Sequence, residues 1–210
     1  MPTGPIRQLT TIICLAMLLA SAVLDAAQSM PLVVHVIDYA HVDSWDLGQA
    51  EHYVAQMFGR VGVRTIWREE RASSADPDNT KDVTVVILSR IMSERMVAAN
   101  HLAKGVLGTA IHPSRRAWLY FDAIEGAAVD RDLAVGMLLG QVIAHEIGHA
   151  VGNLAHTDHG TMQAVLNRGL ETFQGFTKVE GQLIRATLSR PVERGTASVL
   201  ATNNLPRSVP

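Results

Sequence analysis

The chain has 210 residues, a formal net charge of −2 and 48% hydrophobic residues. This length and composition predict one globular domain that can bury a sizeable core. The charge is nearly balanced and only 5% of the residues are aromatic. The composition therefore argues against a nucleic-acid-binding protein and against a highly charged interaction tail.

Residues 1–29 have the pattern of a targeting segment. Arg7 precedes an uncharged, largely apolar run from Leu9 to Leu24, and small residues follow at positions 26, 27 and 29. We interpret this segment as a secretory signal peptide. The alternative is a membrane anchor, but the run is short for a bilayer span. The only cysteine, Cys14, lies here, so we expect a secreted or periplasmic protein without disulfide bonds.

The next hundred or so residues are predicted to alternate between strands and helices. Strands are expected at 32–38, 63–67, 82–89, 105–112 and 116–121. Asp43 or Ser44 can cap a helix that runs to about Gly59. Residues 68–81 are expected to form a loop, and residues 90–104 a short helix or an irregular crossing. The apolar face of the first helix is assigned to Trp45, Leu47, Ala50, Val54, Met57 and Phe58.

The central feature of the sequence is the stretch Val142–Gly152, which contains His145, Glu146 and His149 in the order His-Glu-x-x-His. Residues four apart on a helix share one face and are about 6 Å apart along its axis, so two imidazoles can reach one ion. Glu146 points to a neighbouring sector, where it can take a proton from a metal-bound water. The flanking residues are apolar nearly all round, which predicts a buried helix. Polar groups in such a helix are costly unless something binds them.

The ends of this helix, and the helix that follows, are predicted from capping signals. We expect Asp130 to cap the central helix, Asp132 to favour its N-terminal end, and Gly152 to end it in a left-handed conformation. Thr177 and Glu180 form a capping-box pattern that opens a last helix. Its inner face is assigned to Leu183, Ile184 and Leu188.

A third histidine and a methionine follow the central helix. His156 comes four residues after Gly152, and the turn Gly160-Thr161-Met162 comes next. With the His-Glu-x-x-His motif, this resembles the metzincin zinc metallopeptidases, whose pattern is H-E-x-x-H-x-x-G-x-x-H followed by a methionine-containing turn. The likeness is to short, secreted bacterial members and covers about residues 130–165. Here the third histidine falls one residue later than in the family, so His159 stays open as an alternative to His156.

The resemblance implies an α+β, metzincin-like domain over residues 30–190. Its expected architecture is a small, twisted, mixed sheet with an active-site helix and a C-terminal helix. Residues 191–210 are expected to be a disordered tail, because the end of the chain lacks periodicity. The strand near Gly108–His112 is implied to lie at a sheet edge and to pair with extended substrate. Met162 is expected to pack beneath the metal ligands. We further expect a monomer, with no nucleic-acid partner and no stable membrane association after signal cleavage.

The implied activity is that of a zinc-dependent endopeptidase acting on peptides or proteins. Zn²⁺ would be held by His145, His149 and His156, and Glu146 would be the catalytic general base. No tyrosine follows Met162, so the group that stabilises the developing oxyanion is not assigned.

Two other interpretations stay open. A thermolysin-type site would take its third ligand from a downstream glutamate, Glu171 or Glu180, although neither has the expected companion motif. A non-catalytic exported binding domain would hold a structural zinc ion, with a fourth ligand such as His159. The intact Glu146 argues against that domain, because a structural site has no use for a free carboxylate beside the metal.

Overall fold

The computed structural model describes residues 29–70, 82–103, 105–164 and 175–190. The predicted signal peptide, Glu171 and the predicted tail lie outside these ranges. In chain order the elements are β1 (Met30–Asp38), α2 (Ser44–Gly59), β2 (Val63–Glu69), β3 (Val83–Leu88), α3 (Arg90–Ala99), β4 (Gly108–Ile111), β5 (Arg116–Tyr120), α4 (Phe121–Arg131), α5 (Val135–Gly152) and α6 (Lys178–Ser189). Among these helices, none is both long enough and apolar enough to cross a membrane.

The five strands form one mixed sheet in the order β2-β1-β3-β5-β4. The first four strands in this order pair in parallel, and β4 pairs antiparallel with β5 at the edge. The central strand β3 is buried at all six positions, which fits its unbroken apolar run because a central parallel strand is covered on both faces. The predicted α+β architecture with a small mixed sheet is confirmed.

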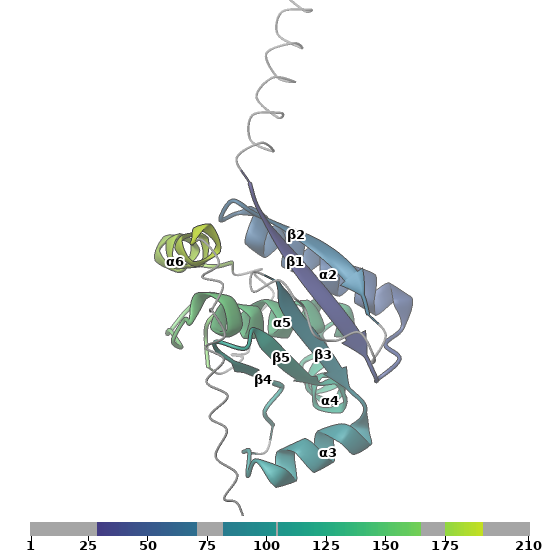
Figure 1. Ribbon diagram of the computed structural model, residues 1–210. Helices are drawn as coiled ribbons and strands as arrows, with labels where there is room; N and C mark the ends of the chain where they lie inside the picture. Colours follow the sequence, from purple (N-terminus) through teal and green to yellow (C-terminus); the bar gives the residue numbers. More distant parts are fainter. Residues whose placement is uncertain (1–28, 71–81, 104, 165–174, 191–210) are drawn as a thin grey trace, which may run out of the picture.

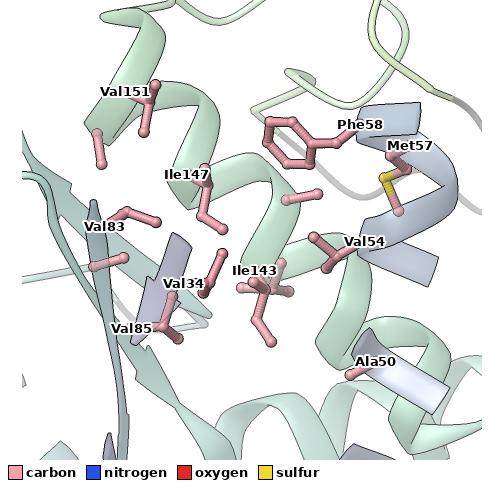
Figure 2. Close-up of a cluster of buried hydrophobic side chains, with 14 of the residues drawn as sticks. Val34, Ala50, Val54, Met57, Phe58, Val83, Val85, Ile143, Ile147 and Val151 are labelled. Carbon is pink, nitrogen blue, oxygen red and sulfur yellow. The ribbon is translucent and has the colours of Figure 1, made fainter. Parts of the chain in front are cut away.

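The two faces of the sheet pack against different helices. Alternate strand residues such as Val34, Val83 and Val85 belong to the main core, together with side chains from α2, α5 and α6. Figure 2 shows α5 with strand valines on one side and the α2 residues Val54, Met57 and Phe58 on the other. The intervening strand residues Ile37, Val86 and Leu88 form a smaller cluster with side chains of α3, which lies apart from α2 and α5 (Figure 1). This alternation follows from the two-residue period of a strand.

Helix α5 approaches α2 closely because small residues lie at the contact. A Cβ atom added at Gly136 would lie 2.6 Å from the carbonyl oxygen of Asp46, and one added at Gly140 would lie 2.8 Å from that of Ala50. The two backbones therefore touch directly. The Asp46 carboxylate also accepts a hydrogen bond of 3.1 Å from the Gly136 backbone N–H, so α2 supplies the acidic group at the N-terminus of α5.

The predicted start and end of the central helix were wrong. Asp130 lies in the last turn of a separate helix, α4, and Asp132 is the left-handed C-cap of that helix, with φ 55°. Helix α5 begins only at Val135 and has no side-chain cap of its own. At its other end Gly152 is still helical, and Asn153 takes the left-handed conformation, with φ 48°. Asparagine tolerates this conformation better than most residues.

The other local caps were predicted correctly. Asp43 accepts a hydrogen bond from the Trp45 backbone N–H at the start of α2. Thr177 and Glu180 make both hydrogen bonds of the capping box at the start of α6. Two assignments to inner faces were wrong, because Trp45 is 72% exposed and Leu183 is 50% exposed. Both side chains point out of the apolar stripe that their helices bury.

The close contact between α5 and α2 predicts the effect of one added methyl group. Gly140→Ala should destabilise the protein by about 1–3 kcal/mol, because the new Cβ displaces the α2 backbone. Gly48→Ala is the matched control in α2, where nothing lies within 4 Å of an added Cβ. It should stabilise the protein by about 0.5–1 kcal/mol through helix propensity. Thermal and urea unfolding measure both effects, and a neutral Gly140→Ala would contradict the packing described.

Candidate metal centre

A cleft of about 1240 Å³ runs along the exposed side of α5. All four residues of β4 line one wall, and α4, Met57 of α2 and the segment after α5 contribute to the rest. From α5 itself the cleft receives Gln141, Val142, His145, Glu146 and His149. The cleft therefore brings the His-Glu-x-x-His motif against the edge strand of the sheet.

Three histidines converge on one point in this cleft. The Nε2 atom of His149 lies 3.0 Å from that of His145 and 3.1 Å from that of His156. The three candidate ligand atoms all lie within 4.8 Å of one another. Nitrogen ligands about 2.0–2.1 Å from a tetrahedral zinc ion are about 3.3 Å apart, so the spacing fits a single ion.

Backbone carbonyls fix which ring nitrogens face the centre. His145 Nδ1 lies 2.8 Å from the Thr161 carbonyl oxygen, and His149 Nδ1 lies 2.6 Å from that of Leu154. A carbonyl only accepts hydrogen bonds, so each Nδ1 carries the proton and each Nε2 presents a lone pair. Two such lone pairs 3.0 Å apart repel unless a cation lies between them. The donor set is therefore that of a metal centre, and three imidazoles suit Zn²⁺.

The segment after α5 orients two of the ligands. Asn153 and Leu154 donate backbone hydrogen bonds to the carbonyls of His149 and Gly148, which closes the helix. Leu154 is 6% exposed, so its side chain anchors the turn, and its carbonyl orients His149. His156 follows two residues later and reaches the other imidazoles. The turn, rather than the spacing within the helix, places the third histidine of the cluster.

Met162 packs against α5 at Gly148, next to His149 in the chain. It is fully buried, and its carbonyl accepts a 2.9 Å hydrogen bond from the Thr157 backbone N–H. A Cβ added at Gly148 would lie 2.5 Å from the Met162 sulfur. Gly148, the first glycine of the motif stretch, therefore makes room for the methionine next to His149.

Glu146 lies beside the three histidines and has no hydrogen-bond partner among the described residues. It is 5% exposed, and burial raises the pKa of its carboxyl group to about 8. A Cβ added at Gly108 would lie 2.9 Å from Glu146 Oε1, so the edge strand touches this carboxyl group. A cation bound by the histidines would favour the ionised form by direct attraction.

His145 and His149 are neutral at neutral pH because both have a lowered pKa. Burial, and to a smaller extent the neighbouring imidazoles, lower the pKa of His145 to about 4, although the hydrogen bond to the Thr161 carbonyl acts in the opposite direction. Burial also lowers the pKa of His149. Neutral imidazole is the form that binds a metal, so protons compete weakly for these two ligands.

The remaining candidates from the sequence lie elsewhere. His159 is not in the histidine cluster, and its carbonyl accepts a hydrogen bond from Thr157. Glu180 is engaged by the backbone N–H of Thr177 and the hydroxyl of Thr157, which argues against a thermolysin-type ligand there. His112 donates to the Ala150 carbonyl, and His35 contacts Glu70 and Asp82 on the sheet.

Two features of the site were not predicted from the sequence: the contact of Gly108 with Glu146, and the place of Gln141 in the cleft wall. Gly108 interrupts an otherwise strand-like run, and a glycine in such a run signals close approach of another group. Gln141 lies four residues before His145, so helical periodicity places it on the ligand face. Both signals are present in the sequence, but neither assigns a residue to the site until β4 and α5 are known to line the same cleft.

Comparisons with known proteins bear on the fold. No protein-family model and no curated protein matches the chain. Among solved structures it is similar to an archaemetzincin from Methanopyrus kandleri, with 14% identity, a TM-score of 0.50, and coverage of 78% of this chain and 97% of that one. A zinc-dependent peptidase from Methanocorpusculum labreanum (strain Z) matches with 11% identity, a TM-score of 0.43, and coverage of 74% and 99%. The likeness to the archaemetzincin confirms a metzincin-like fold.

The geometry makes a prediction about the third ligand. His156→Ala should lose most of the bound zinc, because it removes one of three converging nitrogens. His159→Ala is the matched control and should keep it. Metal analysis after dialysis against a weak chelator measures both. The opposite pattern would transfer the ligand role to His159.

A second prediction concerns the metal-free protein. The folded pKa of Glu146 lies above its value of 4.5 in the unfolded chain, so the stability of the fold falls as pH rises from about 4.5 through about 8. In chelator-treated protein, Glu146→Gln should raise the melting temperature at pH 9 and change it little at pH 5. Equal shifts at both pH values would contradict the burial of this carboxyl group.

Proposed function

We propose that this protein is a zinc-dependent metallopeptidase of metzincin type. The observation that carries the proposal is the convergence of the His145, His149 and His156 Nε2 atoms beside a buried, unpaired Glu146 in an open cleft. A structural zinc site is closed by four protein ligands, whereas a catalytic one keeps a position open. No fourth histidine, cysteine or carboxylate joins the cluster among the described residues. This favours an enzyme over a binding domain with a structural ion.

The three histidines would hold the ion, and Glu146 would move the proton. A bound zinc ion lowers the pKa of water towards about 7 and polarises a carbonyl group. The carboxylate of Glu146 has no hydrogen bond to give up, so it is free to accept a proton from a water molecule in the cleft. It can then donate that proton to the leaving amine. Contact with Gly108 restricts where the carboxyl group can lie.

The edge strand β4 would hold the substrate. β4 pairs with β5 on one side only, and all four of its residues line the cleft. An extended peptide can add to such an edge through backbone hydrogen bonds. Backbone pairing would hold a peptide alongside Glu146 with little dependence on its sequence, which suits an endopeptidase acting on peptides or unfolded proteins.

We also propose that the enzyme acts outside the cytoplasm. The support is the pattern of residues 1–29 and the absence of cysteine from residues 30–210. Mass spectrometry of the exported protein should find its N-terminus between about residues 26 and 31, and an intact Met1 on membrane-embedded protein would contradict this.

The general-base role predicts the effect of Glu146→Gln. The variant keeps the shape of the side chain but cannot accept the proton. It should bind zinc like the parent and cleave unstructured peptides about 10²–10⁴-fold more slowly. Glu94→Gln, at an exposed position on α3, is the matched control and should leave the rate unchanged. If the zinc-loaded parent cleaves nothing in a broad peptide pool, the peptidase proposal fails.

A further inference from the structure

Gln141 is a buried polar residue in the cleft wall. It is 8% exposed, and its amide has no hydrogen-bond partner among the described residues. Gln141 nevertheless lines the cleft. The amide atoms of Gln141 are not among the side-chain atoms that the described structure seals from solvent without a partner, so they open onto the cleft. A polar group that faces a cleft without a protein partner is available to a ligand.

The position of Gln141 relates it to the metal centre. It lies four residues before His145, so the two share one face of α5 and are about 6 Å apart along the helix axis. Met57 of α2 and Val142 also line the cleft, and both are apolar. Glu146 is the only charged residue of α5. The stretch of cleft wall formed by Met57, Gln141 and Val142 thus carries a single amide between two apolar side chains.

We propose that Gln141 determines specificity at a position next to the scissile bond, where it selects a glutamine side chain. This inference rests on the proposed peptidase function. A substrate side chain that extends from the metal centre along α5 reaches Gln141 after about one helical turn, a distance that a glutamine spans. The Gln141 N–H donates to the substrate amide oxygen, and its oxygen accepts from the substrate amide N–H, so both amides are satisfied.

Other side chains of similar length fit this wall less well. Methionine has nearly the same shape but leaves the Gln141 amide unpaired. Glutamate can accept a hydrogen bond from the Gln141 amide but cannot donate one, so the Gln141 amide oxygen stays unpaired. Leaving a buried polar partner unpaired lowers the specificity constant by about tenfold or more.

The experiment compares peptides that differ at one position. A peptide library with glutamine, methionine, glutamate or leucine on either side of the cleaved bond is digested by the zinc-loaded protein. In parallel, binding of the uncleaved peptides to the Glu146→Gln variant is measured by calorimetry. Both measurements are repeated with Gln141→Met. Gln182→Met, at an exposed position on α6, is the matched control.

The expected result is a preference for glutamine over methionine of about tenfold at one flanking position, in both cleavage and binding. Gln141→Met should abolish or reverse it while zinc content and melting temperature stay near those of the parent, and Gln182→Met should keep it. A parent that cleaves the library without preferring glutamine overturns this inference and leaves the peptidase function intact. A glutamine preference that persists in the Gln141→Met variant also overturns this inference and leaves the peptidase function intact. A zinc-loaded parent that cleaves nothing overturns both.

Discussion

Burial of α5 is the constraint on which the rest of the structure depends. The helix lies between the sheet and α2, so two of its sides must be apolar or small (Figure 2). Its polar side chains are therefore confined to the side that faces the cleft. The sheet-facing side holds Ile143, Ile147 and Val151, each fully buried, and each such side chain contributes about 1.5–3 kcal/mol to folding. This apolar burial offsets the cost of keeping unpaired polar groups in the same helix.

Those unpaired groups lie together at the cleft. The Nδ1 atoms of His145 and His149 are satisfied by carbonyls. Within the part of the chain that the structure describes, their Nε2 atoms contact only imidazoles of the cluster, and the Glu146 carboxyl group and the Gln141 amide have no hydrogen-bond partner. Polar groups that a fold leaves unpaired in this way are available to ligands. The nitrogen atoms suit a cation, the carboxylate a proton, and the amide another amide. One geometric restriction thus accounts for the positions of the candidate metal centre, the proposed base Glu146 and the proposed specificity residue Gln141.

Local signals in the sequence predicted local structure well. Asp43 and Thr177 cap helices within three residues of themselves, so their patterns suffice. The start of α5 was not predictable in this way, because its acidic partner, Asp46, is 90 residues away. Helix α4 was missed since the acidic residues at its end also resemble a cap for the next helix. The left-handed Asp132 separates the two helices, and only the folded backbone shows this.

The candidate site also has a part that local sequence signals predict and a part that depends on the folded backbone. Helical spacing predicted that His145, Glu146 and His149 lie together, because a helix fixes their relation. The position of His156 could not be predicted from helical spacing, because it depends on the turn that follows α5. Asn153 and Leu154 donate hydrogen bonds to the last carbonyls of α5, and the Leu154 carbonyl then accepts from His149. The two residues that end the helix therefore also orient the second ligand. A left-handed asparagine placed after Gly152 accommodates the spacing that is one residue longer than the metzincin pattern, and the chain still brings His156, rather than His159, to the metal position.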